Sequence, residues 1–264
     1  MTCPPAASSN RARPRRTLNL LSCNILAGGS VKRYRDYVTG SWKQVLPHGK
    51  RENLDGLARL LGDFDLVALQ EADAGSLRSG FLNQTQYLAE AAHFPFWTHQ
   101  PNRRVSKLAT SSNGLLAREE PREVLDYPLP GRIPGRGALW VRFGDGTDEL
   151  IVVVAHLSLG AQARARQVAF LAELLDGHEH AVLMGDLNTS AQSRELAPLF
   201  KLTSLAAPEQ APATFPAWQP KRAIDHILVS RSISVEARWA LPHQVSDHLP
   251  IAARISMPAG TTQT

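Results

Sequence analysis

Short apolar runs of strand length, some of them paired directly with one another, dominate the sequence. Residues 138–143 and 150–155 form one such pair, and the turn residues 144–146 between them suit a hairpin. Residues 51–61 and 161–175 instead show the apolar spacing of amphipathic helices. Since strands and helices do not alternate strictly, we expect two mostly antiparallel or mixed sheets packed face to face, with helices outside.

Further segments complete the predicted pattern. Short strands are also expected at residues 18–23, 66–69, 115–117, 181–184, 227–229 and 251–255. The polar stretch 94–112 and the proline-rich stretch 206–220 are expected to be irregular. With 264 residues, 43% of them hydrophobic, the chain has enough apolar side chains for one core. We expect a flexible basic leader at 1–16, one catalytic domain at 17–258 and a tail at 259–264.

The positive charge of the chain is concentrated at its N-terminus. The formal net charge is +5, and four arginines lie in the first 16 residues. The remaining 25 basic residues are nearly balanced by 24 acidic residues. Proteins that grip a long nucleic-acid duplex usually carry a broader basic excess. A solvated leader is therefore expected, and transient contact with an anionic surface, including peripheral contact with a membrane, is the alternative.

Cysteine content and hydropathy bear on the cellular compartment. Cys3 lies in the leader and Cys23 in an apolar run, so no disulfide framework is suggested. No apolar segment follows Met1 as in a secretory signal, and no uninterrupted apolar run approaches the roughly 18 residues that cross a bilayer. The expected location is therefore the cytoplasm. The sequence also has no Cys/His cluster of the kind that binds structural zinc.

Polar side chains recur at the ends of the predicted strands. Asn24, Glu71 and His156 each end or follow an apolar run. Asp186 and Asn188 follow another run, and both would lie on one face if the extended backbone continued. Each residue alone has an ordinary interpretation as a turn former, a satisfied buried residue or an Asx turn. Because strand ends can hold side chains in one cleft, the set as a whole indicates a functional site.

Two Asp-His pairs lie next to the last predicted strands. Asp225 and His226 precede the strand at 227–229, and the tripeptide Ser246-Asp247-His248 precedes the strand at 251–255. Either pair alone is unremarkable, but two pairs that each adjoin a strand are less easily explained as turns. We expect His226 to be structural.

The order of these motifs is more specific than any one of them. Six motifs follow one another between Leu18 and Ile255: Ser-Cys-Asn, Leu-Gln-Glu, an apolar run ending in His-Leu, Gly-Asp-Leu-Asn, Ile-Asp-His-Ile and Ser-Asp-His-Leu-Pro-Ile. The succession resembles the endonuclease/exonuclease/phosphatase superfamily, which includes DNase I, exonuclease III-type repair nucleases, neutral sphingomyelinases and inositol polyphosphate 5-phosphatases. The resemblance implies the α/β fold of DNase I, a four-layer α/β/β/α sandwich in which two packed mixed sheets are flanked by helices. It also implies a cleft at one edge of the sandwich.

A metal site is implied by the same resemblance. Glu71 would be the principal ligand, and Asn24 would support the metal, with Asp247 nearby or through water. Oxygen donors of this kind suit Mg²⁺ or Mn²⁺.

The reaction implied by the resemblance is in-line attack of water on a phosphoester. Asp186 would orient or deprotonate the water, and Asn188 would hydrogen-bond a phosphoryl oxygen. His248 would contact the scissile phosphate, and Asp225 would hold His248 in the required tautomer and favour its charged form. His156 would stabilise the phosphate or protonate the leaving group.

Three further residues are predicted to bind substrate. Arg132 and Arg136 lie in a Gly/Pro/Arg loop and would clamp a second phosphate or a headgroup, with a solvated loop as the alternative. Asn113 lies roughly where DNase I carries the acidic residue that orients the equivalent of His156. The protonation of His156 is therefore left open.

A metal-dependent phosphodiesterase that acts on a small molecule or a lipid headgroup is the function that the sequence favours, since the body of the chain is nearly neutral. The alternative is a Mg²⁺-dependent DNA or RNA endonuclease or exonuclease, which the basic leader favours. A catalytically inactive binding module is a third hypothesis, although all the motif residues needed for chemistry are present. The motifs alone do not exclude monoester phosphatase activity. The predicted partner is thus a phosphoester: a lipid headgroup, a small molecule or a nucleic acid.

Overall fold

The computed structural model describes residues 15–26, 50–105, 109–131 and 135–258. One sheet consists of β1 (Arg15–Asn24), β2 (Leu66–Asp73), β3 (Phe96–Val105), β4 (Ala109–Ala117), β10 (Ser234–Ala240) and β11 (Ile251–Pro258). The other consists of β5 (Glu123–Pro128), β6 (Gly137–Phe143), β7 (Leu150–Ala155), β8 (Ala181–Asp186) and β9 (Asp225–Val229). The helices are α2 (Lys50–Leu61), α3 (Gln84–Ala91), α4 (Ala161–Leu175) and α5 (Ala197–Leu202), with short 3-10 turns η3 (Leu77–Ser79) and η4 (Gly146–Asp148).

Both sheets are mixed. The strand order is β10-β11-β1-β2-β4-β3 in the first sheet and β5-β6-β7-β8-β9 in the second. β1 pairs in parallel with β2, and β7 pairs in parallel with β8, whereas the other neighbouring strands are antiparallel. Because β1, β2, β7 and β8 each lead toward the same end of the sandwich, the residues at their carboxyl ends can share one site.

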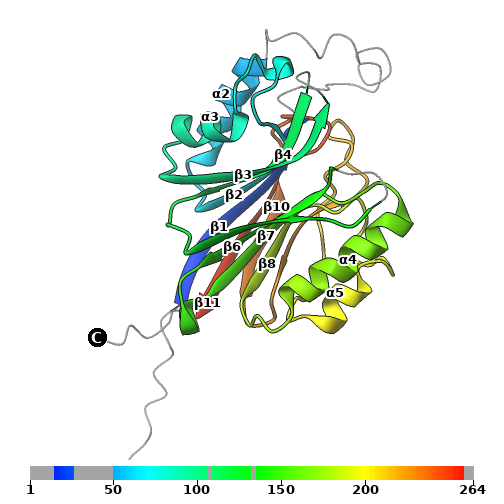
Figure 1. Ribbon diagram of the computed structural model, residues 1–264. Coiled ribbons are helices and arrows are strands. Elements are labelled where there is room, and N and C mark those ends of the chain that lie inside the picture. The colour runs from blue at the N-terminus through cyan, green and yellow to red at the C-terminus, as the bar shows by residue number, and fades with distance from the viewer. Residues whose placement is uncertain (1–14, 27–49, 106–108, 132–134, 259–264) are drawn as a thin grey trace, which may run out of the picture.

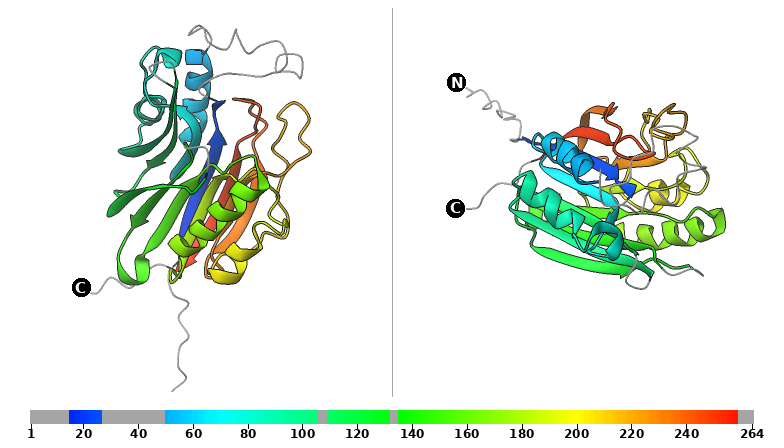
Figure 2. Two further views of the ribbon diagram at one scale, coloured as in Figure 1. Left: turned by 45° about the vertical axis from the view of Figure 1, so that its right-hand side comes forward. Right: turned by 90° about the horizontal axis from the view of Figure 1, so that it is seen from above.

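Alternation along the strands explains the four layers. In β7, Val152 and Val154 face the core between the two sheets, whereas Ile151 and Val153 face α4 and α5. The first sheet buries its outer face in the same way against α2 and α3. Figure 1 shows α2 and α3 on one side of the stacked sheets and α4 and α5 on the other, and the turned views of Figure 2 show the same order. The expected α/β/β/α sandwich is therefore confirmed.

The hairpin predicted at 138–143 and 150–155 is present as β6 and β7. The expectation of irregular structure at 94–112 is wrong, because most of this stretch lies in β3 and β4. Its polar side chains are compatible with a strand because they pair across the sheets, as when Gln100 Nε2 donates to Tyr127 O at 3.1 Å. β5 and β10 were not expected from the sequence, and both are edge strands whose side chains are largely exposed.

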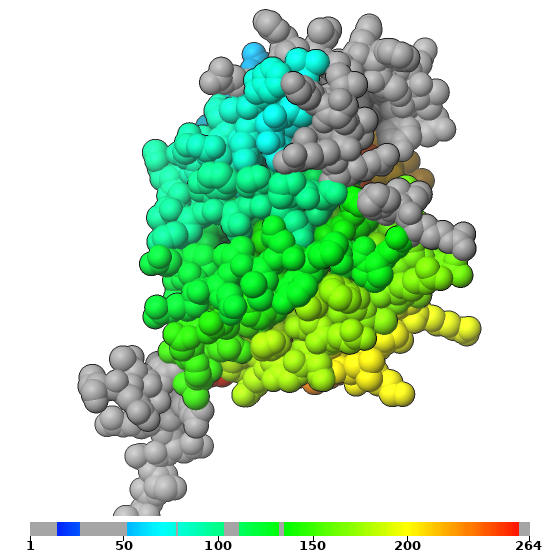
Figure 3. Space-filling view, in the orientation of Figure 1, coloured from blue at the N-terminus to red at the C-terminus, as the bar shows by residue number. Residues whose placement is uncertain are grey.

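Side chains of the two sheets and of α4 form a continuous surface on the face seen in Figure 3. Within the described residues, none of the helices combines the length and the apolar character needed to cross a membrane.

Candidate active site

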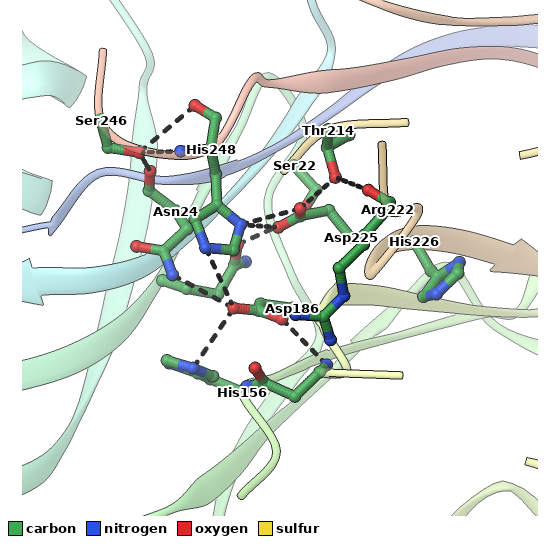
Figure 4. A network of polar contacts seen from close by, with 12 residues as sticks. Ser22, Asn24, His156, Asp186, Thr214, Arg222, Asp225, His226, Ser246 and His248 are labelled. Atoms are coloured by element: carbon green, nitrogen blue, oxygen red, sulfur yellow. Dashed lines mark hydrogen bonds and ion pairs between the residues drawn. The ribbon is translucent and has the colours of Figure 1, made fainter. Parts of the chain in front are cut away.

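The motif residues come together where the ends of the strands meet (Figure 4). Asn24 is the last residue of β1 in the first sheet, and Asp186 is the last residue of β8 in the second. Asn24 Nδ2 donates to Asp186 Oδ2 at 3.3 Å, so a hydrogen bond joins the two sheets here. Asp225 begins β9 opposite Asp186, and His156 directly follows β7. The packing of the sheets therefore brings together side chains that are 162 positions apart in the sequence.

His248 and Asp225 form a buried pair. His248 Nδ1 lies 2.9 Å from Asp225 Oδ2 and 3.1 Å from Asp225 Oδ1. Thr214 Oγ1 donates to the same carboxylate. With Nδ1 toward Asp225, His248 directs Nε2 toward Asp186 Oδ2, at 3.8 Å. The pair thus fixes which ring nitrogen faces the site.

The environment of His248 favours its charged form. Burial alone would lower the pKa of His248, but the charge and hydrogen bond of Asp225, and then the charges of Asp186 and Asp247, raise it to about 9. His248 is therefore positively charged at neutral pH. A charged donor of this kind suits an anionic phosphoryl oxygen.

Asp186 is the central carboxylate of the site. Its Oδ2 lies 3.5 Å from His156 Nε2 and 3.8 Å from His248 Nε2. Burial, and then the nearby charge of Asp225, raise the pKa of Asp186 to about 7, although the positive His248 opposes this shift. A carboxylate whose pKa lies near neutral pH is suited to accepting a proton from water.

The ring of His156 lies between Asp186 and Glu71, with Nδ1 3.9 Å from Glu71 Oε1. Burial lowers the pKa of His156 well below its usual value, and the charges of Arg136 and His248 lower it further. His156 is therefore neutral at pH 7, in contrast to His248. A neutral imidazole has one N–H donor and one acceptor nitrogen.

An irregularity in β2 presents Glu71. The register between β2 and β4 shifts between Leu69 and Ala72, and Glu71 has a φ of +57°. Such a bulge redirects a side chain and is common next to active sites. The side chain of Glu71 is 30% exposed and accepts a hydrogen bond from Asn24 Nδ2 at 3.3 Å. Glu71 thus adjoins the buried Asn24 while remaining open to an ion from solvent.

Backbone and hydroxyl contacts hold the segment Ser246-Asp247-His248 next to β1. Ser246 Oγ donates to Asn24 O and accepts from His248 N at 3.0 Å. Asp247 O accepts from Ala217 N at 2.7 Å. Burial raises the pKa of Asp247, and the positive His248 opposes that shift. The tripeptide therefore places Asp247 in the neighbourhood of Asn24 and His248.

The chain turns after β8 and does not stay extended. β8 ends at Asp186, and Asn188 has a φ of +54°. Asn188 N donates to Asp186 Oδ1 at 2.9 Å, which is an Asx turn. The expectation that strand alternation places both side chains on one face is therefore wrong, and the turn interpretation is correct. Asn188 Nδ2 donates to Leu157 O at 2.9 Å, and the amide carries a second N–H.

Gly185 allows β7 and β8 to approach closely beneath these side chains. Its φ is +143°, and a Cβ at this position would lie 1.9 Å from Ala155 O. Since His156 follows Ala155 and Asp186 follows Gly185, the close approach helps to set the separation of the two side chains.

The three residues predicted to bind substrate differ in their placement. Arg132 lies outside the described residues. Arg136 is half-buried, and its charge acts on His156. Asn113 is fully buried, and its Nδ2 donates to Gly137 O at 2.9 Å. Because this contact joins β4 to β6 inside the sandwich, Asn113 connects the two sheets, and its placement does not support direct contact with substrate.

Some residues that support the site had no signal in the sequence. Thr214 lies in the stretch expected to be an irregular loop, and no spacing connects it with its partner in β9. Arg164 of α4 binds both carboxylate oxygens of Glu195, at 2.8 and 3.0 Å, and donates to Ser158 O at 3.2 Å. These contacts fix the segment that follows His156. His226, by contrast, is buried beside the Thr189 carbonyl, at 2.8 Å, which agrees with a structural role.

Among the described residues, we compare two groups of side chains that have donors for a cation. One is the set implied by the sequence, which comprises Glu71, Asn24 and Asp247. The other comprises Asp186, Asp225 and His248, whose ligand atoms lie within 4.8 Å of one another. Asp225 and His248 are already hydrogen-bonded to each other, so binding a metal there would disrupt that pair. The first set, whose oxygen donors include a partly exposed carboxylate, fits Mg²⁺ or Mn²⁺ better.

The sequence from residue 17 to residue 248 matches the model of the endonuclease/exonuclease/phosphatase family. The chain belongs to the endonuclease/exonuclease/phosphatase family. Members of this family are phosphoester hydrolases that typically use divalent metals. The match covers all the candidate site residues from Asn24 to His248.

Solved structures of low sequence identity share this family fold. An endonuclease/exonuclease/phosphatase family protein from Bacteroides thetaiotaomicron has a TM-score of 0.69 and 19% identity, covering 93% of this chain and 100% of its own. A mannosyl-6-phosphatase of the same organism has a TM-score of 0.64 and 20% identity, covering 90% and 99%. A humanised TDP2 of D. rerio has a TM-score of 0.66 and 16% identity, covering 90% and 98%. No curated protein sequence matches significantly. These likenesses show the fold.

Proposed function

We propose that this member of the family is a divalent-metal-dependent phosphodiesterase that hydrolyses a small molecule or a lipid headgroup by in-line attack of water. The observation that carries the proposal is the arrangement around Asp186. Its carboxylate lies 3.5 Å from neutral His156 and 3.8 Å from charged His248. A buried base between a neutral and a charged imidazole suits attack on a phosphoryl group, because the base can orient the water and the two imidazoles can donate hydrogen bonds to oxygens that gain negative charge.

Each side chain then has a distinct role. Asp186 orients the attacking water and accepts its proton. His248, held and charged by Asp225, donates from Nε2 to a phosphoryl oxygen. Asn188 donates its second amide N–H to another phosphoryl oxygen without adding negative charge. Neutral His156, 3.5 Å from Asp186, donates a hydrogen bond to the leaving oxygen, which takes a proton from solvent water as Asp186 returns its own proton to solvent.

We place the cation at Glu71, supported by Asn24 and Asp247. When bound, a divalent cation supplies neutralisation of phosphoryl charge. Asn24 directs its Nδ2 at Glu71, while its Oδ1 accepts from Leu26 N at 3.2 Å. Ligation by the amide oxygen therefore requires a half turn of the Asn24 amide, which exchanges its nitrogen and oxygen.

The charge distribution supports a compact substrate over a long duplex. Outside the first 16 residues, basic and acidic residues are nearly balanced, whereas gripping a duplex needs many phosphate contacts. The similarity to a mannosyl-6-phosphatase makes a sugar phosphate monoester a necessary comparison substrate.

A substrate panel with added Mg²⁺, Mn²⁺ or Ca²⁺ tests the proposal. The panel contains a synthetic diester, a sugar phosphate monoester, phospholipids, RNA and supercoiled plasmid. We expect diester or phospholipid hydrolysis with Mg²⁺ or Mn²⁺, and a loss of roughly 100-fold or more in kcat for Asp186→Asn, which removes the base. Asp145→Asn, a matched change of an exposed carboxylate, should stay within about twofold of the wild type.

Other outcomes would overturn the proposal. Plasmid nicking that Asp186→Asn abolishes, without diester or phospholipid hydrolysis, would establish a nuclease. Turnover of the monoester alone would establish a phosphatase. No turnover, together with no binding of millimolar Mg²⁺ or Mn²⁺ by calorimetry, would establish a binding module.

A further inference from the structure

A turn of the chain over residues 214–222 lies against the buried pair that His248 and Asp225 form, here called the catalytic pair. Arg222 N donates to Phe215 O at 2.9 Å, and Phe215 N donates to Arg222 O at 3.1 Å, so the two residues face each other across the turn. The turn is tied to the site at two points. Ala217 N donates to Asp247 O at 2.7 Å, and Thr214 Oγ1 donates to the carboxylate that holds His248. Its position relative to the reacting groups is therefore well defined.

Two contacts link the turn to His248 in series. The ring of Phe215 lies 4.8 Å from the ring of His248, at 50°. The guanidinium carbon of Arg222 lies 5.7 Å from the centre of the Phe215 ring, within the range of a cation–π contact. In Figure 4 the Arg222 side chain extends from the turn toward the side of the site that holds Asp186.

Arg222 is exposed, and among the described residues no carboxylate lies within ion-pair distance of its guanidinium. A guanidinium has five N–H donors in a planar fork and matches the oxygens of a phosphate. A fixed turn that carries such a group beside the catalytic pair is suited to receiving an anion.

We propose that Arg222 binds a non-bridging oxygen of the substrate's phosphoryl group, with Phe215 supporting the guanidinium. The inference rests on the proposed function of the site. It adds a substrate-binding residue that lies outside the succession of motifs in the sequence. Its ligand class is a tetrahedral oxyanion, which includes a phosphodiester, a phosphomonoester and inorganic phosphate. Because the attraction grows with negative charge, doubly charged phosphate should depend on Arg222 more than a singly charged diester does.

Steady-state kinetics with the synthetic diester, and competitive inhibition by inorganic phosphate, test the inference in the metal-loaded protein. Arg222→Gln should raise KM and the inhibition constant of phosphate by about 10-fold or more, the effect of losing one charge-assisted hydrogen bond. Because the contact is made in both ground and transition states, kcat should change less than KM. Arg222→Lys should recover part of the loss.

The matched control is Lys221→Gln, which removes a charge from the neighbouring exposed position of the same turn. It should leave both constants within about twofold of the wild type, because general charge effects at an exposed site are small. Thermal unfolding of Arg222→Gln checks that the turn is intact. Equal effects of Arg222→Gln and Lys221→Gln, or no effect of Arg222→Gln on either constant, would overturn the inference.

The two proposals fail separately. If the wild type hydrolyses the diester but Arg222→Gln keeps the wild-type KM and phosphate inhibition, the role of Arg222 is refuted and the proposed function stands. If the wild type hydrolyses no ester, direct binding of inorganic phosphate by calorimetry still reports on Arg222. Loss of that binding in Arg222→Gln alone would support the inference while the proposed function fails.

Discussion

Replacing Gly185 with alanine should destabilise the junction of β7 and β8 beneath the active site. The added Cβ would lie 1.9 Å from Ala155 O, whereas such contacts are not found below 3.0 Å. The obstructing atom belongs to the backbone of a buried strand, so it cannot rotate away as a flexible side chain would. Relief therefore requires a shift of about 1 Å between the two strands or a change of the backbone at residue 185.

The cost follows from two contributions. A non-glycine residue at a φ of +143° is strained by about 1–3 kcal/mol. Forcing the packed strands apart adds roughly 1–3 kcal/mol. A total of about 2–6 kcal/mol corresponds to a fall in Tm of roughly 4 °C or more for a domain of this size. Activity should fall as well, because the shift alters the separation of His156 and Asp186.

Thermal unfolding followed by circular dichroism, together with the diester assay, measures both effects. Gly56→Ala is the matched control, since a Cβ at this position in α2 would meet His243 Nε2 at an ordinary 3.7 Å. In a helix this change should stabilise the protein by about 0.5–1 kcal/mol. If Gly185→Ala unfolds within about 2 °C of the wild type and keeps its activity, the steric reasoning is refuted.

Three further predictions concern the side chains around the site. In the metal-free protein, NMR should find His248 titrating near pH 9, and Asp225→Asn should lower that pKa, because it removes the largest charge that opposes the effect of burial. The stabilisation of the folded protein by charged His248 is present in full below pH 6.5 and is lost as the pH rises through about 9. Asp225→Asn should therefore lower the free energy of unfolding more at pH 6 than at pH 10. Equal losses at the two pH values would contradict this. Arg164→Ala should lower the free energy of unfolding by about 3–5 kcal/mol, because it leaves the partly buried Glu195 without its partner. It should also lower kcat, because Arg164 holds the segment that follows His156. A variant as stable as the wild type in urea would exclude this role. A chelator should abolish hydrolysis, and added Mg²⁺ or Mn²⁺ should restore it. The Glu71→Gln variant should need a higher metal concentration than the wild type for its activity to be restored. Turnover that resists the chelator would argue against a metal at Glu71.

The fold could be predicted from the sequence where strands are buried on both faces. Val152, Val154 and their neighbours in β7 lie in a run with no alternative to burial, so the β6–β7 hairpin was predictable. β5 and β10 are edge strands with exposed side chains, and β3 is polar, so their pairing depends on neighbouring strands that no local pattern indicates. The segment pattern predicted two packed sheets with helices outside, but it could not predict the order of the strands within each sheet, because strand order is a non-local property.

The same limit applies to the site. Asn24, Glu71 and Asp186 were identified because each lies in or at the end of a recognisable motif. Thr214 and Arg164 act through tertiary contacts, across 11 and 31 positions of the sequence, to side chains that no motif links to them. The bulge that presents Glu71 was equally hidden, since it arises from the pairing of β2 with β4 and not from the residues of β2 alone.

The position of β11 in the first sheet has a consequence for biosynthesis. This strand lies between β10 and β1, although it comes last in sequence among the strands that the structure describes. Residues Asn24 and Glu71 leave the ribosome early, yet β1 has an unpaired edge until β11 emerges, and His248 precedes β11 by only a few residues. The proposed hydrolytic centre therefore cannot assemble on a nascent chain until β11 has been translated, and we expect partly made chains to be inactive.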